Sequence, residues 1–314
     1  PLLPRPVSGG VDPALLGFVS IVTVGAGLLF GLAPALHAAR TDASVPGRAV
    51  GRAVTMSGRG HQMRRALVVG ELALTTTLLI GAGLLVRSFQ RLGAVDLGMQ
   101  IEGVVAIELH GSEWWNLEPE EAQAQWDAVM LAIRAVPGVE EAGAIDYVPL
   151  SASYSCDGVR RGDIPPPPRG EGMCAETRMV LPGAVSTLGV PLLRGRLLRA
   201  TDLLDQPSVA VIDQNLADAL WAGEDALGKR FAVHGNVHEV VGIVGNMLHF
   251  GPGEMVRPQV YLDAAQDGWS GIQRGLTILA RGAETGASAG TAVGTLVAPI
   301  RTAVAGVNAS IAVG

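Results

Sequence analysis

The sequence predicts a membrane protein with α-helical spans plus an α+β extracytoplasmic domain. Three observations support this class. Two long apolar runs lie in the first third of the chain, a short basic segment separates them, and about 220 residues with alternating strand and helix patterns follow. The mean hydropathy of +0.35 averages over an apolar part and a polar part, so each part is interpreted separately.

The second apolar run, residues 66–86, carries a single charge, Glu71. At ~1.5 Å per residue its 21 residues would extend about 31 Å, enough to cross a bilayer core. The first run, residues 14–33, has no charge at all. A buried core helix of a soluble protein is the alternative, but such helices rarely stay apolar on every face. We expect two transmembrane helices.

Glu71 lies about five residues inside the edge of its run. An acid within a span is a candidate for a functional role such as a proton relay. Because neither span contains a second charge, a role in helix packing or at an interface is the better expectation.

Residues 34–65 form a basic linker whose arginines include Arg40, Arg48 and Arg52, with one acid, Asp42. The positive-inside rule places such a segment in the cytoplasm, so residues 1–13 and 92–314 would lie outside. Nine of the 23 Lys+Arg residues and three of the 29 Asp+Glu residues precede residue 92. The rest of the chain therefore contains 14 basic and 26 acidic residues. The net charge of the outer part is therefore about −12, and a negative net charge argues against nucleic acid as a partner.

The outer part, residues 92–314, begins with a strand, a helix and a second strand, and we expect β-α-β modules with helices on one face of a sheet. Residues 151–174, rich in Ser, Gly and Pro, are expected to interrupt this pattern. The expected strands are 104–109, 139–148, 209–212, 237–244, 259–262 and 276–280, and the expected helices are 118–135, 214–221 and 287–304. The last helix is apolar enough to suggest a third span, but its Thr, Pro and Arg residues favour packing on the domain surface.

Cys156 and Cys174 are the only cysteines of the chain. In an oxidising compartment two such cysteines form a disulfide, whereas two buried free thiols are the alternative. We expect the disulfide if the domain is extracytoplasmic.

Motifs of known chemistry are missing from the sequence. It contains no phosphate-binding loop of the GxxxxGK[ST] type, no HExxH, no CxxC and no GxSxG. His234 and His238 could suggest a metal site, but Gly235-Asn236 between them favours a hairpin turn. We therefore expect no enzyme, with no catalytic residue, no cofactor and no metal ligand.

Several segments nevertheless resemble one family in the right order along most of the chain. The stretch 64–74 (RRALVVGELAL), continued by 81–89 (GAGLLVRSF), resembles the duplicated permeases of the MacB/FtsX-like ABC transporter superfamily. Segments similar to that family's periplasmic core domain are 187–196 (TLGVPLLRGR), 209–214 (VAVIDQ), 220–230 (LWAGEDALGKR), 240–245 (VVGIVG) and 257–262 (RPQVYL). The segment 31–40 (GLAPALHAAR) resembles the end of a preceding FtsX-type membrane unit. Residues 181–185 (LPGAV) lack the aromatic residue that usually follows Pro-Gly in the family, and the Cys156–Cys174 loop is not one of its hallmarks.

The resemblance implies a multi-pass inner-membrane protein with a large periplasmic domain. Because the sequence begins at Pro1 and ends without a closing signal, we expect it to be an internal fragment of a longer chain. It implies a separate ABC ATPase subunit as partner beside the lipid bilayer, with other permease halves or periplasmic proteins as further partners. ATP hydrolysis would then move the periplasmic domain, in export or mechanotransmission, through Arg40, Arg48 and Arg52 as the contact with the ATPase. The alternative is a membrane-anchored periplasmic binding or scaffold module without an ATPase.

Overall fold

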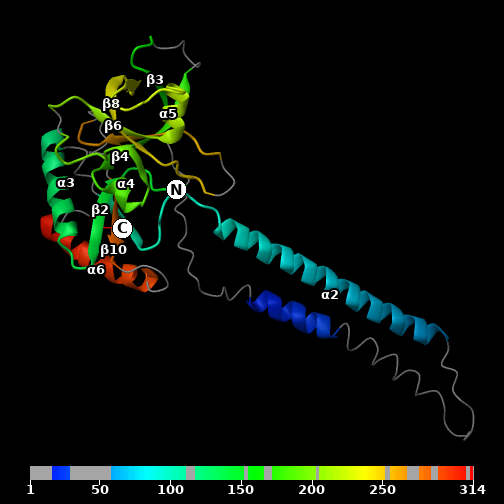
Figure 1. Ribbon diagram of the computed structural model, residues 1–314. Helices are drawn as coiled ribbons and strands as arrows, with labels where there is room; N and C mark the ends of the chain where they lie inside the picture. The colour runs from blue at the N-terminus through cyan, green and yellow to red at the C-terminus, as the bar shows by residue number, and fades with distance from the viewer. Residues whose placement is uncertain are drawn as a thin grey trace, which may run out of the picture. The chain divides into compact units, whose positions relative to one another are not determined.

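The computed structural model describes residues 16–28, 58–110, 117–151, 155–165, 172–202, 205–251, 255–266, 276–283, 289–308 and 312–313. The chain divides into two units, Pro1–Ala94 and Val95–Gly314, which are described separately (Figure 1).

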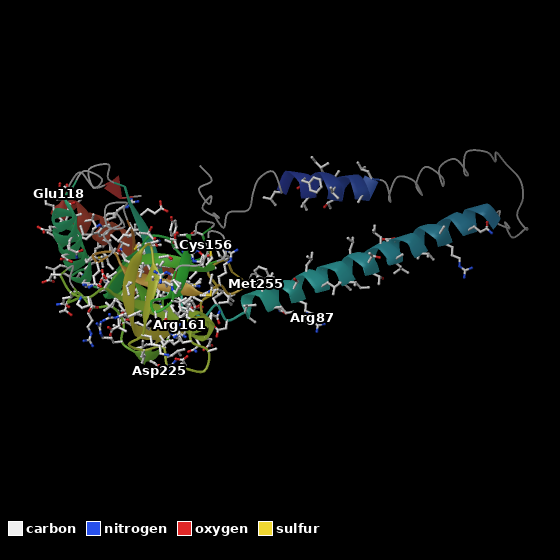
Figure 2. All side chains as sticks on the ribbon, turned by 90° about the horizontal axis from the view of Figure 1, so that it is seen from above. Arg87, Glu118, Cys156, Arg161, Asp225 and Met255 are labelled. Carbon is white, nitrogen blue, oxygen red and sulfur yellow. A yellow bond between two sulfur atoms is a disulfide. The ribbon has the colours of Figure 1, made fainter. Side chains whose placement is uncertain are left out.

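The first unit contains the helix Leu16–Leu28 and the 36-residue helix α2, Gly58–Gly93. In the part of the chain that is described, one helix is long and apolar enough to cross a membrane, Val68–Gly93, with a mean hydropathy of 1.8 and none of it buried. Its 26 residues extend about 39 Å at ~1.5 Å per residue. Side chains project from all sides of α2 (Figure 2).

The predicted span 66–86 lies inside α2, which is helical beyond it at both ends. Hydropathy identifies the apolar segment but does not identify where the helix ends, because the polar residues on either side, such as Arg, Gln and His, are also compatible with helix. The hydroxyls of Thr75, Thr76 and Thr77 donate to the carbonyls four residues earlier at 2.7–2.8 Å. These bonds satisfy three polar groups within the helix itself.

The second unit alternates strands and helices from Val104 onward. Its helices are α3 (Pro119–Arg134), α4 (Ala184–Thr187), α5 (Gln214–Leu220) and α6 (Ala289–Val307). Its strands are β1 (Val104–His110), β2 (Val139–Ile145), β3 (Cys156–Arg161), β4 (Met173–Leu181), β5 (Leu192–Gly195), β6 (Val209–Asp213), β7 (Arg230–Val233), β8 (Asn236–Val244), β9 (Gln259–Asp263), β10 (Thr277–Gly282) and β11 (Ala312–Val313).

The strands pair in a sheet with two parts. One part is an arm in the order β11-β1-β10-β2-β4, with antiparallel pairing throughout. The other part is a closed ring, because β4 pairs with β3, the path continues through β7, β8, β6 and β9, and β9 pairs back onto β4 in parallel. Strand β4 belongs to both parts and therefore joins the arm to the ring.

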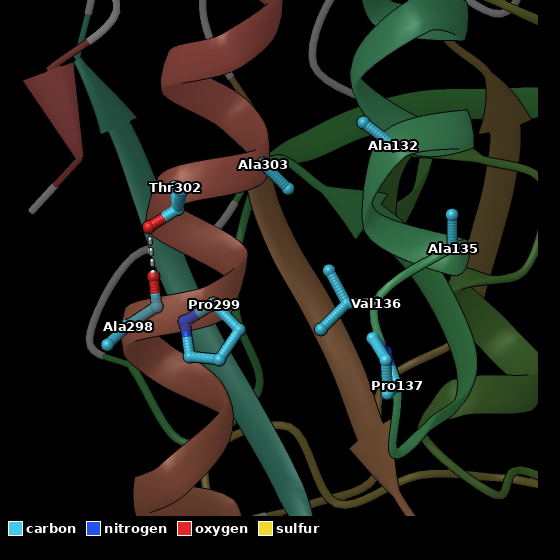
Figure 3. A pocket seen from close by; sticks show the side chains of 8 residues that line it. All are labelled: Ala132, Ala135, Val136, Pro137, Ala298, Pro299, Thr302 and Ala303. Atoms are coloured by element: carbon cyan, nitrogen blue, oxygen red, sulfur yellow. Dashed lines mark hydrogen bonds between the residues drawn. The ribbon is translucent and has the colours of Figure 1, made fainter.

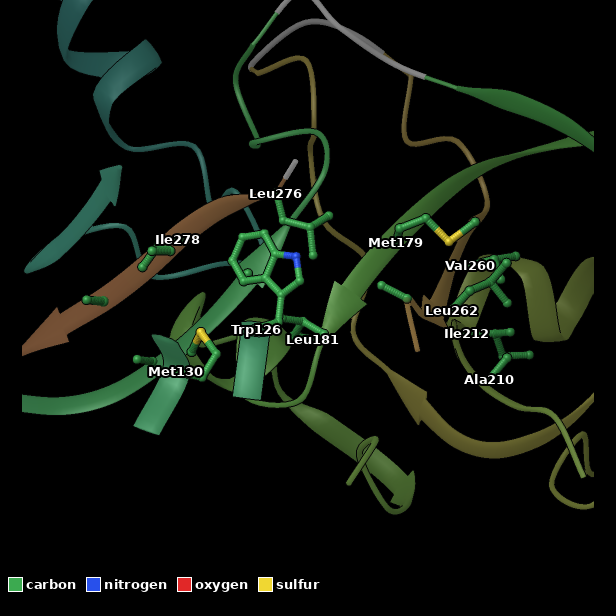
Figure 4. Close-up of a cluster of buried hydrophobic side chains, with 14 of the residues drawn as sticks. Trp126, Met130, Met179, Leu181, Ala210, Ile212, Val260, Leu262, Leu276 and Ile278 are labelled. Atoms are coloured by element: carbon green, nitrogen blue, oxygen red, sulfur yellow. The ribbon is translucent and has the colours of Figure 1, made fainter. Parts of the chain in front are cut away.

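Buried side chains form two clusters on opposite faces of the sheet. The larger cluster extends from the strands of the ring to α3, where Trp126 is fully buried in the same cluster as Met130, Leu276 and Ile278 (Figure 4). Helix α6 adds Leu296, Ile300 and Val304 at intervals of four residues, the spacing of a helix that packs on one face. At 19 residues with one face buried, α6 is a surface-packed helix of the domain, as its polar residues predict.

The smaller cluster contains α4 residues Ala184 and Val185, together with Leu188 and Met247. The expectation that helices cover only one face of the sheet is therefore wrong for α4. This helix has four residues, too few to show helical periodicity in the sequence.

Residues 151–174 were expected to be irregular, but they contain β3 and the start of β4. The sequence of β3, CDGVRR, shows no alternation of apolar residues, and its side chains are mostly half-buried or exposed. Its strand conformation depends on hydrogen bonds to β4 on one edge and β7 on the other. Such pairing with distant segments leaves no local signature.

Candidate functional site

The residues Val95–Gly103, called the connector here, lead from the end of α2 into β1. Met99 is buried and Leu97 packs against the same cluster as Leu188 and Met247. Asp96 and Gln100 are exposed. The connector thus lies against the face of the second unit that carries α4.

The backbone of the connector touches the loop that follows β8. The Leu248 amide donates to the Leu97 carbonyl at 2.9 Å. Gly98 has a φ of 69°, and a Cβ at this position would lie 1.9 Å from the Asn246 carbonyl oxygen. Only glycine combines this backbone conformation with such a close approach. The Gly98 amide also donates to the Asp96 carboxylate at 2.9 Å, which closes a local turn.

Arg281, from β10, joins the connector to α4. Its Nη2 donates to the carbonyls of Gln100 and Thr187, both at 2.6 Å. Its Nη1 donates to the Glu102 carbonyl at 2.9 Å, and its Nε to the Thr187 carbonyl at 3.2 Å. The Gln100 amide donates to the Leu188 carbonyl at 2.7 Å. One planar guanidinium therefore fixes two carbonyls of the connector against the end of α4.

The loop touched by the connector is bonded in turn to α5 and β9. The side chains of Asn246 and Asn215 share a hydrogen bond of 3.0 Å, and the Asn215 amide donates to Asn246 Oδ1 at 2.9 Å. The Gln259 Nε2 donates to the Met247 carbonyl at 2.7 Å, and the Tyr261 hydroxyl donates to Gln259 Oε1 at 2.8 Å. A continuous path of polar contacts therefore runs from the connector into the ring.

Asp213 connects the end of β6 to this path. Its Oδ1 accepts from the amides of Leu216, in the first turn of α5, and Gln259, at the start of β9, at 2.9 and 3.0 Å. Burial raises the pKa of the Asp213 carboxyl to about 7, although these amides oppose the shift. Burial likewise raises the pKa of Asp263, at the end of β9, to about 7.

A buried ion pair lies beside the same strands. Arg178 and Glu176 of β4 are both fully buried, with 3.4 Å between Nη2 and Oε2, and Arg257 donates to Glu176 Oε1 at 3.0 Å. The Arg178 guanidinium also lies 5.8 Å from the centre of the Tyr147 ring. Burial raises the pKa of the neighbouring Asp146 to about 6, against the opposing effect of Arg178.

The residues singled out from the sequence are not gathered at this site. Glu71 is exposed on α2, in the first unit. Arg40, Arg48 and Arg52 lie outside the described residues. The structure therefore leaves the roles of these four residues as expectations.

Cys156 of β3 and Cys174 of β4 form a disulfide in the structure, with their Cα atoms 5.6 Å apart. The antiparallel register pairs Gly158 with Cys174, so the two cysteines lie diagonally across adjacent strands. The disulfide ties β3 to the strand that joins the ring and the arm.

A hairpin joins β7 and β8 as predicted, but its turn residues are His234 and Gly235, one position earlier than the expected Gly235-Asn236. The Nε2 of His234 lies 3.0 Å from the Asp157 carboxylate. His238 is buried in β8 beside the Phe231 ring. Among the described residues no group of three or more His, Cys, Asp or Glu side chains could hold a metal ion.

A shallow hollow lies between α3 and α6 (Figure 3). It is lined by Ala132, Ala135, Val136, Pro137, Ala298, Pro299, Thr302 and Ala303. The Thr302 hydroxyl, its one polar side-chain group, donates to the Ala298 carbonyl at 3.0 Å. Small apolar side chains without converging polar groups offer no catalytic chemistry here.

Sequence reasoning missed the connector contacts. Asp96 and Gly98 form a recognisable turn pattern, which could have indicated a specific backbone conformation. Arg281 gives no such indication, because its partner Gln100 is 181 residues away.

These features define an α+β unit whose connector follows directly after the apolar helix α2 in the chain. The model of one family, the MacB-like periplasmic core domain, matches residues 65–298. This match covers most of the sequence, and the chain belongs to that family, a domain of ABC-type transporter permeases.

Solved structures with similarity to the chain include three domains. The periplasmic region of MacB from Actinobacillus actinomycetemcomitans is 14% identical, with 69% of this chain and 90% of that chain covered and a TM-score of 0.43. The extracellular domain of the noncanonic ABC-type transporter YknZ from Gram-positive bacteria is 13% identical, with 67% and 99% covered and a TM-score of 0.41. A permease-protein domain from Porphyromonas gingivalis is 18% identical, with 58% and 75% covered and a TM-score of 0.36. No curated protein matches the chain.

Proposed function

We propose that this chain is part of a permease subunit that couples ATP hydrolysis by a separate ABC ATPase to movement of its periplasmic domain. The observation that carries the proposal is the connector, which Arg281 and the close contact at Gly98 hold against α4, β10 and the loop after β8. A helix whose last residues continue into such a fixed segment can pass a displacement to the folded unit. A flexible linker would absorb the same displacement.

In this proposal residues 66–86 and 14–33 span the inner membrane, and the basic linker 34–65 lies in the cytoplasm. Residues 1–13 and 92–314 then lie in the periplasm. The apolar helix Val68–Gly93 supports the second span by its length and composition. Arg40, Arg48 and Arg52 would contact the ATPase, since they belong to the basic linker that lies on the cytoplasmic side in this proposal.

The central test measures whether nucleotide moves the domain relative to α2. Spin labels at Leu79→Cys in α2 and Val237→Cys in β8 report the distance between the units in nanodiscs that contain the permease and its ATPase. Both native residues are exposed, at 73% and 49%, so labelling leaves the core intact. We expect a non-hydrolysable ATP analogue to shift the distance distribution, and Arg281→Ala to broaden it and reduce the shift.

Arg194→Ala is the matched control, because Arg194 makes an exposed ion pair with Asp225 and does not contact the connector. A distance distribution that nucleotide leaves unchanged in the wild-type complex would contradict the coupling proposal.

The linker is tested separately by changing Arg40, Arg48 and Arg52 to Glu. We expect stimulation of the ATPase by the permease to be lost. Labelling of Val237→Cys from the periplasmic side checks that the changed charges have not inverted the topology. If stimulation survives with the topology intact, the assignment of this linker is wrong. If no ATPase activity accompanies the native permease at all, the scaffold alternative is favoured.

A further inference from the structure

Four exposed apolar residues lie in the connector or close to it along the contacts described above. They are called the apolar rim here: Val95, Leu150, Met255 and Val256, with 38%, 44%, 84% and 37% of their surfaces exposed. Met255 is labelled in Figure 2. Single exposed apolar residues need no explanation, but a group around one feature does.

Hydrogen bonds bring the rim together from three parts of the sequence. The Leu150 amide donates to the His249 carbonyl at 2.7 Å, one residue from Leu248, which bonds to Leu97 of the connector. Asn215 Nδ2 donates to the Val256 carbonyl at 3.5 Å, and the same side chain bonds to Asn246 beside Gly98. Leu150 is thus bonded to the residue next to Leu248, Val256 is bonded to the Asn215–Asn246 pair beside Gly98, and Met255 precedes Val256 in the chain.

The backbone at Leu150 gives a second, independent observation. Its φ is 64°, in the left-handed region that residues other than glycine rarely adopt. The hydrogen bond to His249 holds this conformation, and the Leu150 Cδ2 lies 3.6 Å from the position of a Cβ built on Gly251. An unfavourable backbone conformation that leaves a leucine half in solvent indicates a partner for that leucine.

Chain length limits how far the rim can lie from the membrane. The proposed span ends at Val86. Seven further residues of α2, about 10 Å, and four residues of extended chain, at most ~14 Å, lead from there to Leu97. Headgroup layers are roughly 5–8 Å thick on each side of the hydrocarbon core. If residues 66–86 span the membrane, as the proposed function requires, the loops bonded to Leu97 are tethered within about 24 Å of the hydrocarbon core, so that apolar residues around Leu97 can reach the headgroup layer.

We propose that the apolar rim docks on the lipid bilayer, with Leu150, Met255 and Val256 inserted among the headgroups of the outer leaflet. Apolar side chains at an interface reach ~5–10 Å into the boundary between headgroups and acyl chains. Methionine, with its flexible and polarisable side chain, suits such an irregular environment. Arg257, next to Val256, pairs with Glu176 and is still 44% exposed, which places a partly exposed positive charge beside the rim, where headgroup phosphates are favoured.

The experiment places an environment-sensitive fluorophore at one cysteine, Met255→Cys, in nanodiscs whose lipids carry a nitroxide on the headgroup. The disulfide between Cys156 and Cys174 keeps the native cysteines out of the labelling reaction. We expect a blue-shifted emission and a loss of fluorescence to the headgroup nitroxide. Val237→Cys is the matched control, because Val237 is 49% exposed and lies seven residues, roughly 23 Å, from the end of β8 that adjoins the connector.

Equal quenching at residues 255 and 237 would overturn the proposal. Protection of residue 255 from a water-soluble quencher without quenching by the lipid nitroxide would also overturn it, and would indicate a protein partner. A third label, at Leu79→Cys in α2, is read with nitroxides placed deep in the acyl chains. If the label at residue 79 is quenched and the label at residue 255 is not, the docking of the rim on the bilayer is refuted and the membrane span stands. If the label at residue 79 is not quenched, the membrane span of the proposed function is refuted.

Discussion

Replacing Arg281 with alanine should destabilise the second unit by about 2–4 kcal/mol. The guanidinium donates four hydrogen bonds to three carbonyls. Thr187 is fully buried, so its carbonyl loses donors where water cannot replace them, at a cost of about 1–3 kcal/mol. Gln100 and Glu102 are exposed, so water substitutes at their carbonyls and about 1 kcal/mol is lost there.

Thermal unfolding of the purified chain in detergent, followed by near-ultraviolet circular dichroism, measures this change. For a unit of about 220 residues, 2–4 kcal/mol corresponds to a decrease in Tm of roughly 4–16 °C. Hydrogen exchange gives a second readout, because the Gln100 amide should exchange faster when the connector is released from α4. Arg281→Lys should restore part of the stability, since an ammonium can reach one carbonyl but not all three.

Arg194→Ala serves as the control, because its ion pair with Asp225 is exposed and such pairs contribute about 0–1 kcal/mol. A decrease in Tm for Arg281→Ala no larger than that of Arg194→Ala would refute the reasoning. The connector would then be held by apolar packing alone.

Three further predictions concern the same unit. Gly98→Ala should lower the free energy of unfolding in urea by more than ~2 kcal/mol, because its Cβ would meet a backbone oxygen at 1.9 Å. Gly223→Ala, at a φ of 76° with open space around it, should lower it by only about 1–2 kcal/mol. Equal losses of stability in the two variants would contradict this prediction. The carboxyl of Asp213, whose pKa is about 7 folded and about 3.9 unfolded, contributes stability that is complete below pH ~4 and lost as the pH rises to ~7, a loss of roughly 4 kcal/mol. Asp213→Asn should reduce the pH dependence of stability by this amount and leave the share of Asp263 and Asp146, and an unchanged profile would count against the buried acid. Reducing the disulfide between Cys156 and Cys174, 18 residues apart in sequence, should lower the free energy of unfolding by about 3 kcal/mol. Denaturant unfolding with and without dithiothreitol measures this change, and a variant with both cysteines replaced by serine should show no response to the reductant.

Much of the fold could be predicted from local patterns. The expected strands around Val104, Val139, Val209, Gln259 and Leu276 are present with shifts of a few residues at their ends. These segments alternate or concentrate apolar residues that the sheet buries, so their signal is contained in a few neighbouring positions. Helices α3, α5 and α6 were predictable for the same reason, with a stripe of apolar residues for each.

The predictions failed where structure depends on distant partners. Strand β3 has few apolar residues and is held by hydrogen bonds to β4 and β7 on both edges. The closed ring requires β4 and β9 to pair in parallel across about 80 residues, with Glu176 opposite Gln259. No local periodicity encodes which strand will be a neighbour.

The sequence by itself determined an apolar helix long enough to cross a bilayer, an acidic α+β domain after it, and a family resemblance that the match over residues 65–298 bears out. Only the tertiary structure decided how the chain leaves that helix. The connector is fixed because Arg281 satisfies carbonyls on segments far apart in the sequence, and because Gly98 allows the backbone at Asn246 to approach. Apolar periodicity is a property of neighbouring residues, whereas hydrogen-bond satisfaction between remote segments exists only once the chain has folded.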